Sequence, residues 1–250
     1  MNTASHSIVI VCEGPGDHRT VPAIADRVLS ESVEWMLPEM LGAYRQWRGL
    51  KHNQPFLAWK QVHTLASEAG IRLNGFFNGE PGAPDAFAAR RALALLKVAG
   101  EDPIDAVILV RDSDNDKERL NGLKQARDEV GNPNPPIIIG VAHTKRECWV
   151  LAGFTPMDKA EQARLGALKQ ELGFDPCLHA DELTAQQDGA KRDAKRVLSQ
   201  LTGNSVDRES TCWKECSFHQ LEARGQKTGL AAFIQELRTK LVPLWTGRTG

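Results

Sequence analysis

Three aspartates stand at alternate positions after an apolar run near the middle of the chain. The run covers residues 107–110, and after Arg111 come Asp112, Asp114 and Asp116. A short run rich in β-branched residues suits a strand buried on both faces, and open α/β sheets bind ligands at the carboxyl ends of such strands. Carboxylates this close repel one another unless they are solvated or share a cation, and Mg²⁺ prefers oxygen ligands. The pattern predicts a metal site, with a polar turn that caps the next helix as the alternative.

Glutamates follow two other apolar runs in a similar way. The first run, residues 7–12, ends at Glu13, and the run at residues 137–142 leads through a basic segment to Glu147. In a mainly parallel sheet, neighbouring strands bring their carboxyl ends to one edge. We therefore expect both glutamates to lie near Asp112 and Asp114.

The remaining pattern predicts the elements that hold these strands. A glycine- and proline-containing turn at residues 13–17 precedes a helix from about His18, capped by Asp17, and two further helices are expected over residues 84–98 and 117–130. Strands that alternate with helices indicate an α/β fold class with a mainly parallel sheet flanked by helices.

Strand signals fade after Pro156. Helices are expected over residues 157–172, 182–201 and 231–241, which together predict a helical C-terminal extension. The predicted domains are therefore residues 1–155 and residues 156–250. The basic cluster at residues 191–196 is expected to form a solvated helix face, with a phosphate contact as the alternative.

The segment at about residues 30–80 has the weakest pattern. It scatters Trp35, Trp47 and Trp59 among basic residues, with a further strand expected over residues 71–77. Charges and rings can bind a nucleic-acid strand through phosphate contacts and base stacking. A helical insertion with its tryptophans in the core is the alternative.

The bulk properties exclude several classes of protein. The formal net charge of the 250 residues is -1, so any contact with a polyanion must come from a local patch. Five cysteines at irregular spacing argue against a secreted disulfide framework. The N-terminal residues resemble no export signal, and no apolar run approaches the roughly 20 residues of a membrane span. We expect a cytoplasmic protein without a membrane partner.

The strand-end motifs also resemble a known family. Cys12-Glu13-Gly14 after a first strand, with Asp112-Ser113-Asp114 after a later one, is similar to the Toprim domain of topoisomerases, bacterial primases and overcoming-lysogenization-defect (OLD) nucleases. The block at residues 143–152 resembles an element of small stand-alone Toprim-like proteins linked with phage defence. The resemblance covers residues 7–155.

The resemblance implies roles for individual residues. Glu13 would be a metal ligand or general acid/base, Asp112 and Asp114 would bind Mg²⁺ or Mn²⁺, and Glu147 would be an additional ligand. Phosphodiester cleavage needs an activated water and neutralised charge at phosphorus, which the metal and nearby cations supply. The candidate cationic side chains are Lys145, Arg146 and His143. Asp116 and Asp17 are expected to cap helices or support the site.

The expected activity is that of a Mg²⁺-dependent nuclease in a prokaryotic antiviral defence system, with DNA favoured over RNA. A topoisomerase needs a tyrosine nucleophile, but the single tyrosine, Tyr44, lies in the poorly patterned segment. No zinc ribbon or polymerase domain of a primase is evident. A phosphate-binding Gly-x-x-x-x-Gly-Lys-Ser/Thr loop is also absent from the sequence, so an ATPase or sensor would be a separate subunit. Homo-oligomerisation is left open.

Other functions compete with this hypothesis. An EF-hand is rejected because its sixth and twelfth positions are Lys117 and Leu123. A haloacid-dehalogenase phosphatase would carry its motif on the first strand, and Asn115 departs from it. A metal-dependent nucleotide-sugar transferase also uses Asp-x-Asp, although it leaves the turn after Glu13 unexplained. A non-catalytic or partner-activated Toprim-like binding module is the alternative from another class.

A separate zinc site is the last candidate. Its ligands would come from Cys177, His179, Cys212, Cys216 and His219, but their spacing matches no recognised zinc module. Ordinary cysteines in a helical region are the alternative. Cys12 and Cys148 are expected to be buried packing residues.

Overall fold

The computed structural model describes residues 5–101, 103–131 and 134–247. By contacts between residues the chain divides into two compact units, each discontinuous in sequence. The first unit comprises Met1–Arg111, Asp116–Val141 and Gln235–Gly250, and the second comprises Asp112–Asn115 and Ala142–Ile234. The predicted division at residue 155 stays a prediction.

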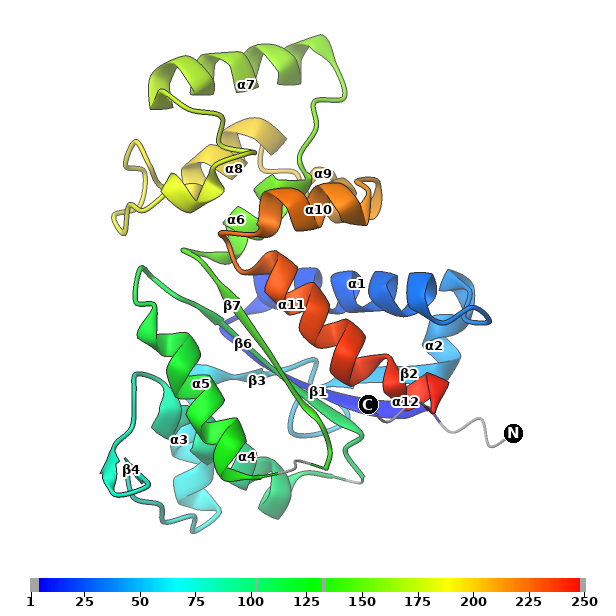
Figure 1. Cartoon of the computed structure of the whole chain (residues 1–250), viewed down its shortest axis with the longest axis vertical. Helices are drawn as coiled ribbons and strands as arrows, with labels where there is room; N and C mark the ends of the chain where they lie inside the picture. Colours follow the sequence, from blue (N-terminus) through cyan, green and yellow to red (C-terminus); the bar gives the residue numbers. More distant parts are fainter. Residues whose placement is uncertain (1–4, 102, 132–133, 248–250) are drawn as a thin grey trace. The chain divides into compact units, whose positions relative to one another are not determined.

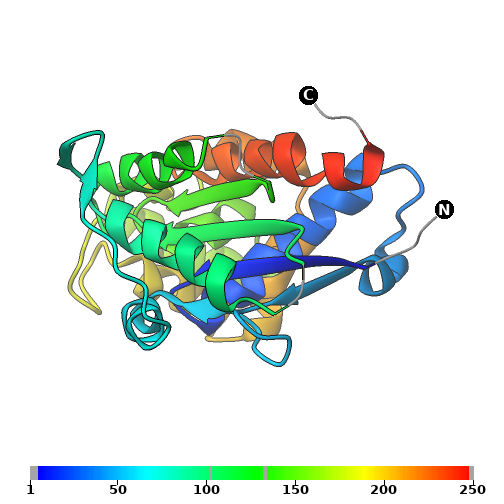
Figure 2. The ribbon, with the colours of Figure 1, turned by 90° about the horizontal axis from the view of Figure 1, so that it is seen from below.

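A central sheet organises the first unit. Its strands are β1 (His6–Cys12), β2 (Arg45–Arg48), β3 (Leu57–Ala58), β6 (Ala106–Asp112) and β7 (Ile137–Ala142). The order is β2-β1-β6-β7, with β3 also paired to β1, and β2, β3 and β6 all run parallel to β1. Figure 2 shows β1, β6 and β7 side by side. The predicted α/β class with a mainly parallel sheet is confirmed.

Helices cover both faces of this sheet (Figure 1). On one face, Val9, Val107 and Ile139 share a hydrophobic core with α3 (Trp59–Glu68), α4 (Ala86–Ala99) and α5 (Glu118–Glu129). The other face is covered by α1 (Pro15–Ser32) and the C-terminal elements η3 (Leu237–Leu241) and α12 (Pro243–Thr246). This double burial explains why the strands are continuous apolar runs.

The segment at residues 30–80 contributes two strands to the sheet. Besides β2, β3 and α3 it forms η1 (Pro38–Met40), α2 (Leu41–Tyr44) and a small antiparallel pair, β4 (Phe76–Phe77) with β5 (Glu80–Pro81). The strand expected over residues 71–77 is therefore wrong for all but its last two residues.

The tryptophans of this segment occupy different environments. Trp59 is buried, and its indole N–H donates to the carbonyl of Val110 at 2.6 Å. Trp47 and Arg45 both donate to the Asp26 carboxylate, whereas Trp35 is 47 % exposed. The alternative with all tryptophans in the core is wrong, because Trp35 lies on the surface. Contact of this segment with nucleic acid stays a prediction.

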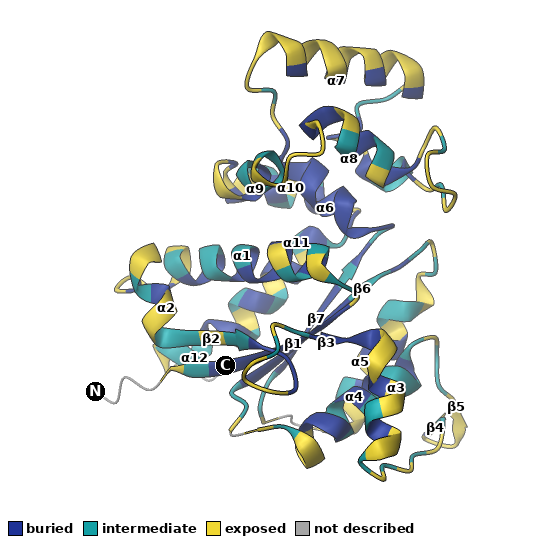
Figure 3. Ribbon diagram, turned by 180° about the vertical axis from the view of Figure 1, so that it is seen from behind, coloured by how far each residue is buried: buried dark blue, intermediate teal, exposed yellow. Residues whose placement is uncertain are grey.

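The second unit is helical around α6 (Arg146–Gly153). All eight residues of α6 are buried, which Figure 3 shows as a dark blue helix. It contacts η2 (Ala180–Glu182), α8 (Ala194–Thr202), α9 (Val206–Lys214) and α10 (Phe218–Gly225). The unit also contains α7 (Lys159–Leu172), and α11 (Leu230–Glu236) begins within it.

The predicted C-terminal helices are partly correct. Those over residues 157–172 and 231–241 are confirmed as α7 and as α11 with η3, a π-helical segment. The helix predicted over residues 182–201 begins only at Ala194, because the Asp193 carboxylate accepts the Lys195 N–H as an N-cap and Gly189 has a φ of 77°. Within the described residues, no helix combines the length and apolar character needed to cross a bilayer.

Candidate functional site

The turn after β6 has a strained backbone. Asp114 and Asn115 have φ values of 46° and 68°, in the left-handed region that L-residues seldom adopt. Aspartate and asparagine tolerate this conformation better than most residues, but it still costs free energy. Such conformations persist where surrounding contacts fix them, and they cluster at functional sites.

Hydrogen bonds fix this turn to the chain that leaves β7. The Ser113 N–H donates to the Ala142 carbonyl at 2.8 Å, and the Asp114 N–H donates to the Thr144 carbonyl at 3.0 Å. Asp112 Oδ1 accepts the backbone N–H of Arg146, the first residue of α6, at 2.8 Å. The first N–H groups of a helix have no partner within it, and the Asp112 carboxylate satisfies one of them.

Two buried cationic side chains, Lys145 and Arg146, follow β7, and each lies against carboxylates. Lys145 Nζ is 3.5 Å from Asp193 Oδ1 and 4.0 Å from Asp188 Oδ1. Burial disfavours the charged form of Asp193, but hydrogen bonds from the Gly189 and Lys195 N–H groups, together with the Lys145 ammonium, hold its pKa below the usual value. These contacts neutralise the cation that the sequence assigns to phosphate.

Arg146 is the second of these cations. Its guanidinium lies 3.2 Å from Glu147 Oε1 and 3.1 Å from Glu209 Oε2. Both Arg146 and Glu147 are less than a tenth exposed. Glu147 thus engages a cation of its own helix, and its role as a metal ligand stays a prediction.

Glu13 follows β1 in the first unit. Its side chain is 37 % exposed, and its Oε1 lies 3.6 Å from an Arg111 guanidinium nitrogen. Asp17 is the third residue of α1 rather than its N-cap, and its carboxylate accepts the N–H groups of Glu13 and of the N-cap Gly14 at 3.0 and 3.2 Å. The helix α1 begins at Pro15, three residues before the expected start.

Asp116 also serves a helix. Its carboxylate accepts the N–H of Glu118, the first residue of α5, at 3.0 Å. This contact agrees with the predicted helix-supporting role of Asp116. Asp112 and Asp114 remain the candidate cation ligands in the turn.

The described part of the chain contains no group of three or more His, Cys, Asp or Glu side chains able to hold a metal ion. The assignment of Glu13, Asp112, Asp114 and Glu147 as four ligands of one metal ion stays a prediction. Mg²⁺ usually keeps several waters and binds proteins through only one or two carboxylates plus substrate phosphates. Asp112 and Asp114 supply that smaller donor set, so their chemistry fits Mg²⁺ or Mn²⁺.

The cysteines form no site of their own. All five are free and buried, and burial raises the pKa of Cys148 to about 11 and that of Cys212 to about 12. Cys12 and Cys148 are both fully buried, as predicted for packing residues. The zinc alternative receives no support, because residues 177–219, all of them described, contain no cluster of metal-binding side chains.

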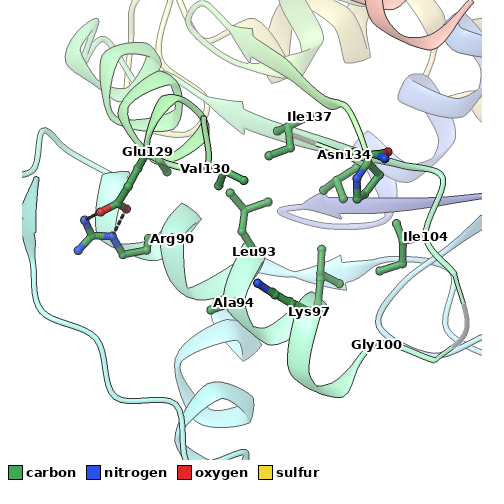
Figure 4. Close-up of a pocket in the computed structure, with 14 residues that line it drawn as sticks. Arg90, Leu93, Ala94, Lys97, Gly100, Ile104, Glu129, Val130, Asn134 and Ile137 are labelled. Atoms are coloured by element: carbon green, nitrogen blue, oxygen red, sulfur yellow. Dashed lines mark hydrogen bonds and ion pairs between the residues drawn. The ribbon is translucent and has the colours of Figure 1, made fainter. Parts of the chain in front are cut away.

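A cavity of about 620 Å³ lies in the first unit, between α4, α5 and the amino-terminal parts of β6 and β7 (Figure 4). Leu93, Ile104 and Ile137 contribute to a mainly apolar lining. Its carboxylate, Glu129, is paired with Arg90 at the rim. The cavity therefore lacks the acidic pair that a catalytic cation needs.

The sequence predicted Asp112 and Asp114 as candidate ligands but did not indicate the residues that contact the turn and the segment after β7. Ser113 stands between the two aspartates and could have been noticed by position alone. Asp193, Glu209 and Thr228 come from segments without a motif, and only the fold shows their contacts with residues 143–149.

The fold and the turn define a broad class, that of α/β proteins in which carboxylates follow a buried strand of a mainly parallel sheet. Comparisons with protein-family models, with curated proteins and with solved structures found no match. The case for a function therefore depends on the chemistry of the turn.

Proposed function

We propose that the protein hydrolyses phosphodiester bonds in nucleic acid with the help of Mg²⁺ or Mn²⁺ held by Asp112 and Asp114. The observation that carries this proposal is the strained turn at the end of β6, in which the Asp112 carboxylate is oriented by the N–H of Arg146. A bound cation supplies an activated water and neutralises charge on the phosphate. The Toprim resemblance of residues 12–14 and 112–114 supports the same chemistry.

The chain's own side chains would then bind and orient the substrate. Lys145 and Arg146 follow β7 in the second unit, where each is paired with carboxylates. Once released from these carboxylates, either cation would stabilise developing charge on a phosphate. Glu13 would act as general acid/base, as the Toprim resemblance implies. We further propose DNA rather than RNA as the substrate and a cytoplasmic role in antiviral defence, with an ATPase or sensor as a separate subunit.

The direct test is incubation of the pure protein with Mg²⁺ and end-labelled DNA or RNA, with EDTA as the metal-free control. We expect strand cleavage that requires Mg²⁺, is abolished by EDTA and returns when Mn²⁺ is added. Labelled sugar nucleotides are included in parallel. Transfer of sugar without strand cleavage would instead establish a nucleotide-sugar transferase and refute the nuclease proposal.

A second candidate, a partner-activated module, is favoured by the non-helical residues 183–193, here called the strap. The strap is bound to the turn, because Asn115 Nδ2 donates to the Thr184 carbonyl at 2.9 Å and Gln186 Nε2 donates to the Asp114 carbonyl at 3.1 Å. Two strap carboxylates, Asp188 and Asp193, face Lys145. If the protein is such a partner-activated module, it is inactive while the strap is bound to the turn and becomes active when a partner displaces the strap.

The strap can be loosened by the double substitution Gln186→Ala and Asp188→Ala. Each lost contact is exposed and worth up to about 1 kcal/mol, so their combined loss should raise Mg²⁺-dependent cleavage about tenfold. Asp193 is left intact because it also caps α8. The matched control is Gln187→Ala in the same strap. Equal rates for the double variant, the control and the parent would contradict regulation by the strap.

A further inference from the structure

Ser113 lies between the two proposed metal ligands but in a different environment. Its side chain is 2 % exposed, while Asp112 and Asp114 are half-buried. Ser113 Oγ is 2.9 Å from His143 Nδ1. A serine beside a histidine can be a nucleophile, but one this deeply buried cannot reach a phosphate of a nucleic-acid strand. The pair is therefore suited to holding the turn rather than to attacking substrate.

The other end of this contact is anchored in the core of the second unit. The backbone N–H of His143 donates to the Thr228 carbonyl at 2.9 Å, and the indole N–H of Trp149 donates to the same carbonyl at 2.8 Å. Thr228 is fully buried, and Trp149 stacks on Phe233 with ring centroids 5.0 Å apart. The Thr228 carbonyl thus links the segment after β7 to the middle of α6.

We propose that His143 is a positioning residue. The hydrogen bonds that connect Thr228, His143 and Ser113 hold the backbone of the turn that carries the Asp112 and Asp114 side chains. This inference rests on the proposed function, because it concerns the same two carboxylates. Left-handed residues such as Asp114 and Asn115 need surrounding contacts to hold them. Metal-binding side chains likewise depend on a supporting layer, whose loss typically weakens metal affinity 10- to 100-fold.

Amide hydrogen exchange tests the structural half of the proposal. The Ser113 and Asp114 N–H groups are hydrogen-bonded, so His143→Ala should accelerate their exchange at least about tenfold. Asparagine places a hydrogen-bonding atom near the position of Nδ1, so His143→Asn should retain most of the protection. Ser113→Ala removes the same hydrogen bond by a smaller change in side-chain volume. This variant replaces His143→Ala in the exchange measurement if His143→Ala does not fold. His219→Ala, at an exposed position of α10, is the matched control.

Mn²⁺ binding, measured by titration calorimetry without nucleic acid, tests the functional half. We expect His143→Ala and Ser113→Ala to weaken Mn²⁺ affinity about tenfold, and His143→Asn and His219→Ala to leave it near the parent value. Unchanged exchange at Ser113 and Asp114 in His143→Ala would overturn the proposal, as would faster exchange with unaltered Mn²⁺ affinity. A parent protein that binds no Mn²⁺ would refute the proposed function, and exchange alone would then decide whether His143 holds the turn.

Discussion

The Asp112→Asn protein is expected to lose about 10³-fold in its rate of Mg²⁺-dependent cleavage while keeping its fold. The amide oxygen of asparagine can still accept the N–H of Arg146, so the contact between the turn and α6 is retained. The negative charge that attracts the cation is lost. Removing one electrostatic partner of a transition state commonly costs 10² to 10³ in rate, and loss of a direct metal ligand belongs at the upper end of that range.

The matched control is Asp116→Asn, two alternate positions further along the same turn. The Asp116 carboxylate accepts the Glu118 N–H at the start of α5, and the amide oxygen of asparagine can accept the same bond, so cleavage and stability should both stay near the parent values. Single-turnover rates at saturating Mg²⁺ and the midpoints of urea unfolding provide the measurements. Equal cleavage by the two variants would remove Asp112 from the metal site.

The central sheet could be predicted because its main strands carry a strong signal. β1, β6 and β7 are continuous apolar runs, and burial on both faces leaves no room for polar residues within them. Their carboxyl ends are marked by turn residues with a clear chemical character. The class of fold and the position of Asp112 and Asp114 follow from these two features.

β2 and β3 could not be predicted, because neither carries that signal. β2 is Arg-Gln-Trp-Arg, yet Arg48 within it is fully buried and donates to Ser7 Oγ and to the carbonyls of Gly49 and Leu50. The hydrogen bonds that the guanidinium donates to a distant side chain and to nearby backbone carbonyls make this charge compatible with a strand. No local pattern contains that information.

The strap was predicted to be helical for a similar reason. Its charged composition is compatible with a solvated helix, but helix propensity alone predicts secondary structure only weakly because tertiary contacts often override it. The outcome is decided by Asp193, which accepts N–H groups from Gly189 and Lys195 and so ends the strap while capping α8. The contacts of the strap with Asn115 and Asp114 depend on tertiary structure, which spacing in the sequence does not encode.

Glu161→Gln is expected to lower the free energy of unfolding by about 3 kcal/mol, because Glu161 and Arg208 form a buried ion pair in the second unit. The Arg208 guanidinium donates to Glu161 Oε1 at 2.6 Å and to Oε2 at 2.8 Å, and both side chains are largely shielded from water. Removing one charge of a buried pair typically costs about 3 to 5 kcal/mol, and here Arg208 would keep its hydrogen bonds to the Thr155 carbonyl and to Thr211 Oγ1. Because glutamine can still accept a hydrogen bond from Arg208, we expect the lower end of that range.

The pH dependence of stability provides a second signature of this pair. Hydrogen bonding to Arg208 is the main reason that the pKa of Glu161 lies below its usual value, and it outweighs the opposing effect of burial. A lowered pKa in the folded state means that the stabilisation is fully present above the unfolded-state pKa of about 4.3 and is lost as the pH falls through the lower folded-state value. Glu161→Gln should therefore show a smaller loss of stability than the parent between about pH 4.3 and more acidic conditions.

Glu171→Gln provides the control for both signatures. Glu171 lies on the same helix, α7, and pairs with Arg196 at 2.9 Å, but its side chain is 42 % exposed. An exposed ion pair contributes at most about 1 kcal/mol, so this variant should lie close to the parent in urea unfolding at pH 7 and retain the parent's acid dependence. If both variants lost the same stability, burial of the Glu161–Arg208 pair would not explain the cost, and the second unit would have to be stabilised mainly by the apolar contacts around α6.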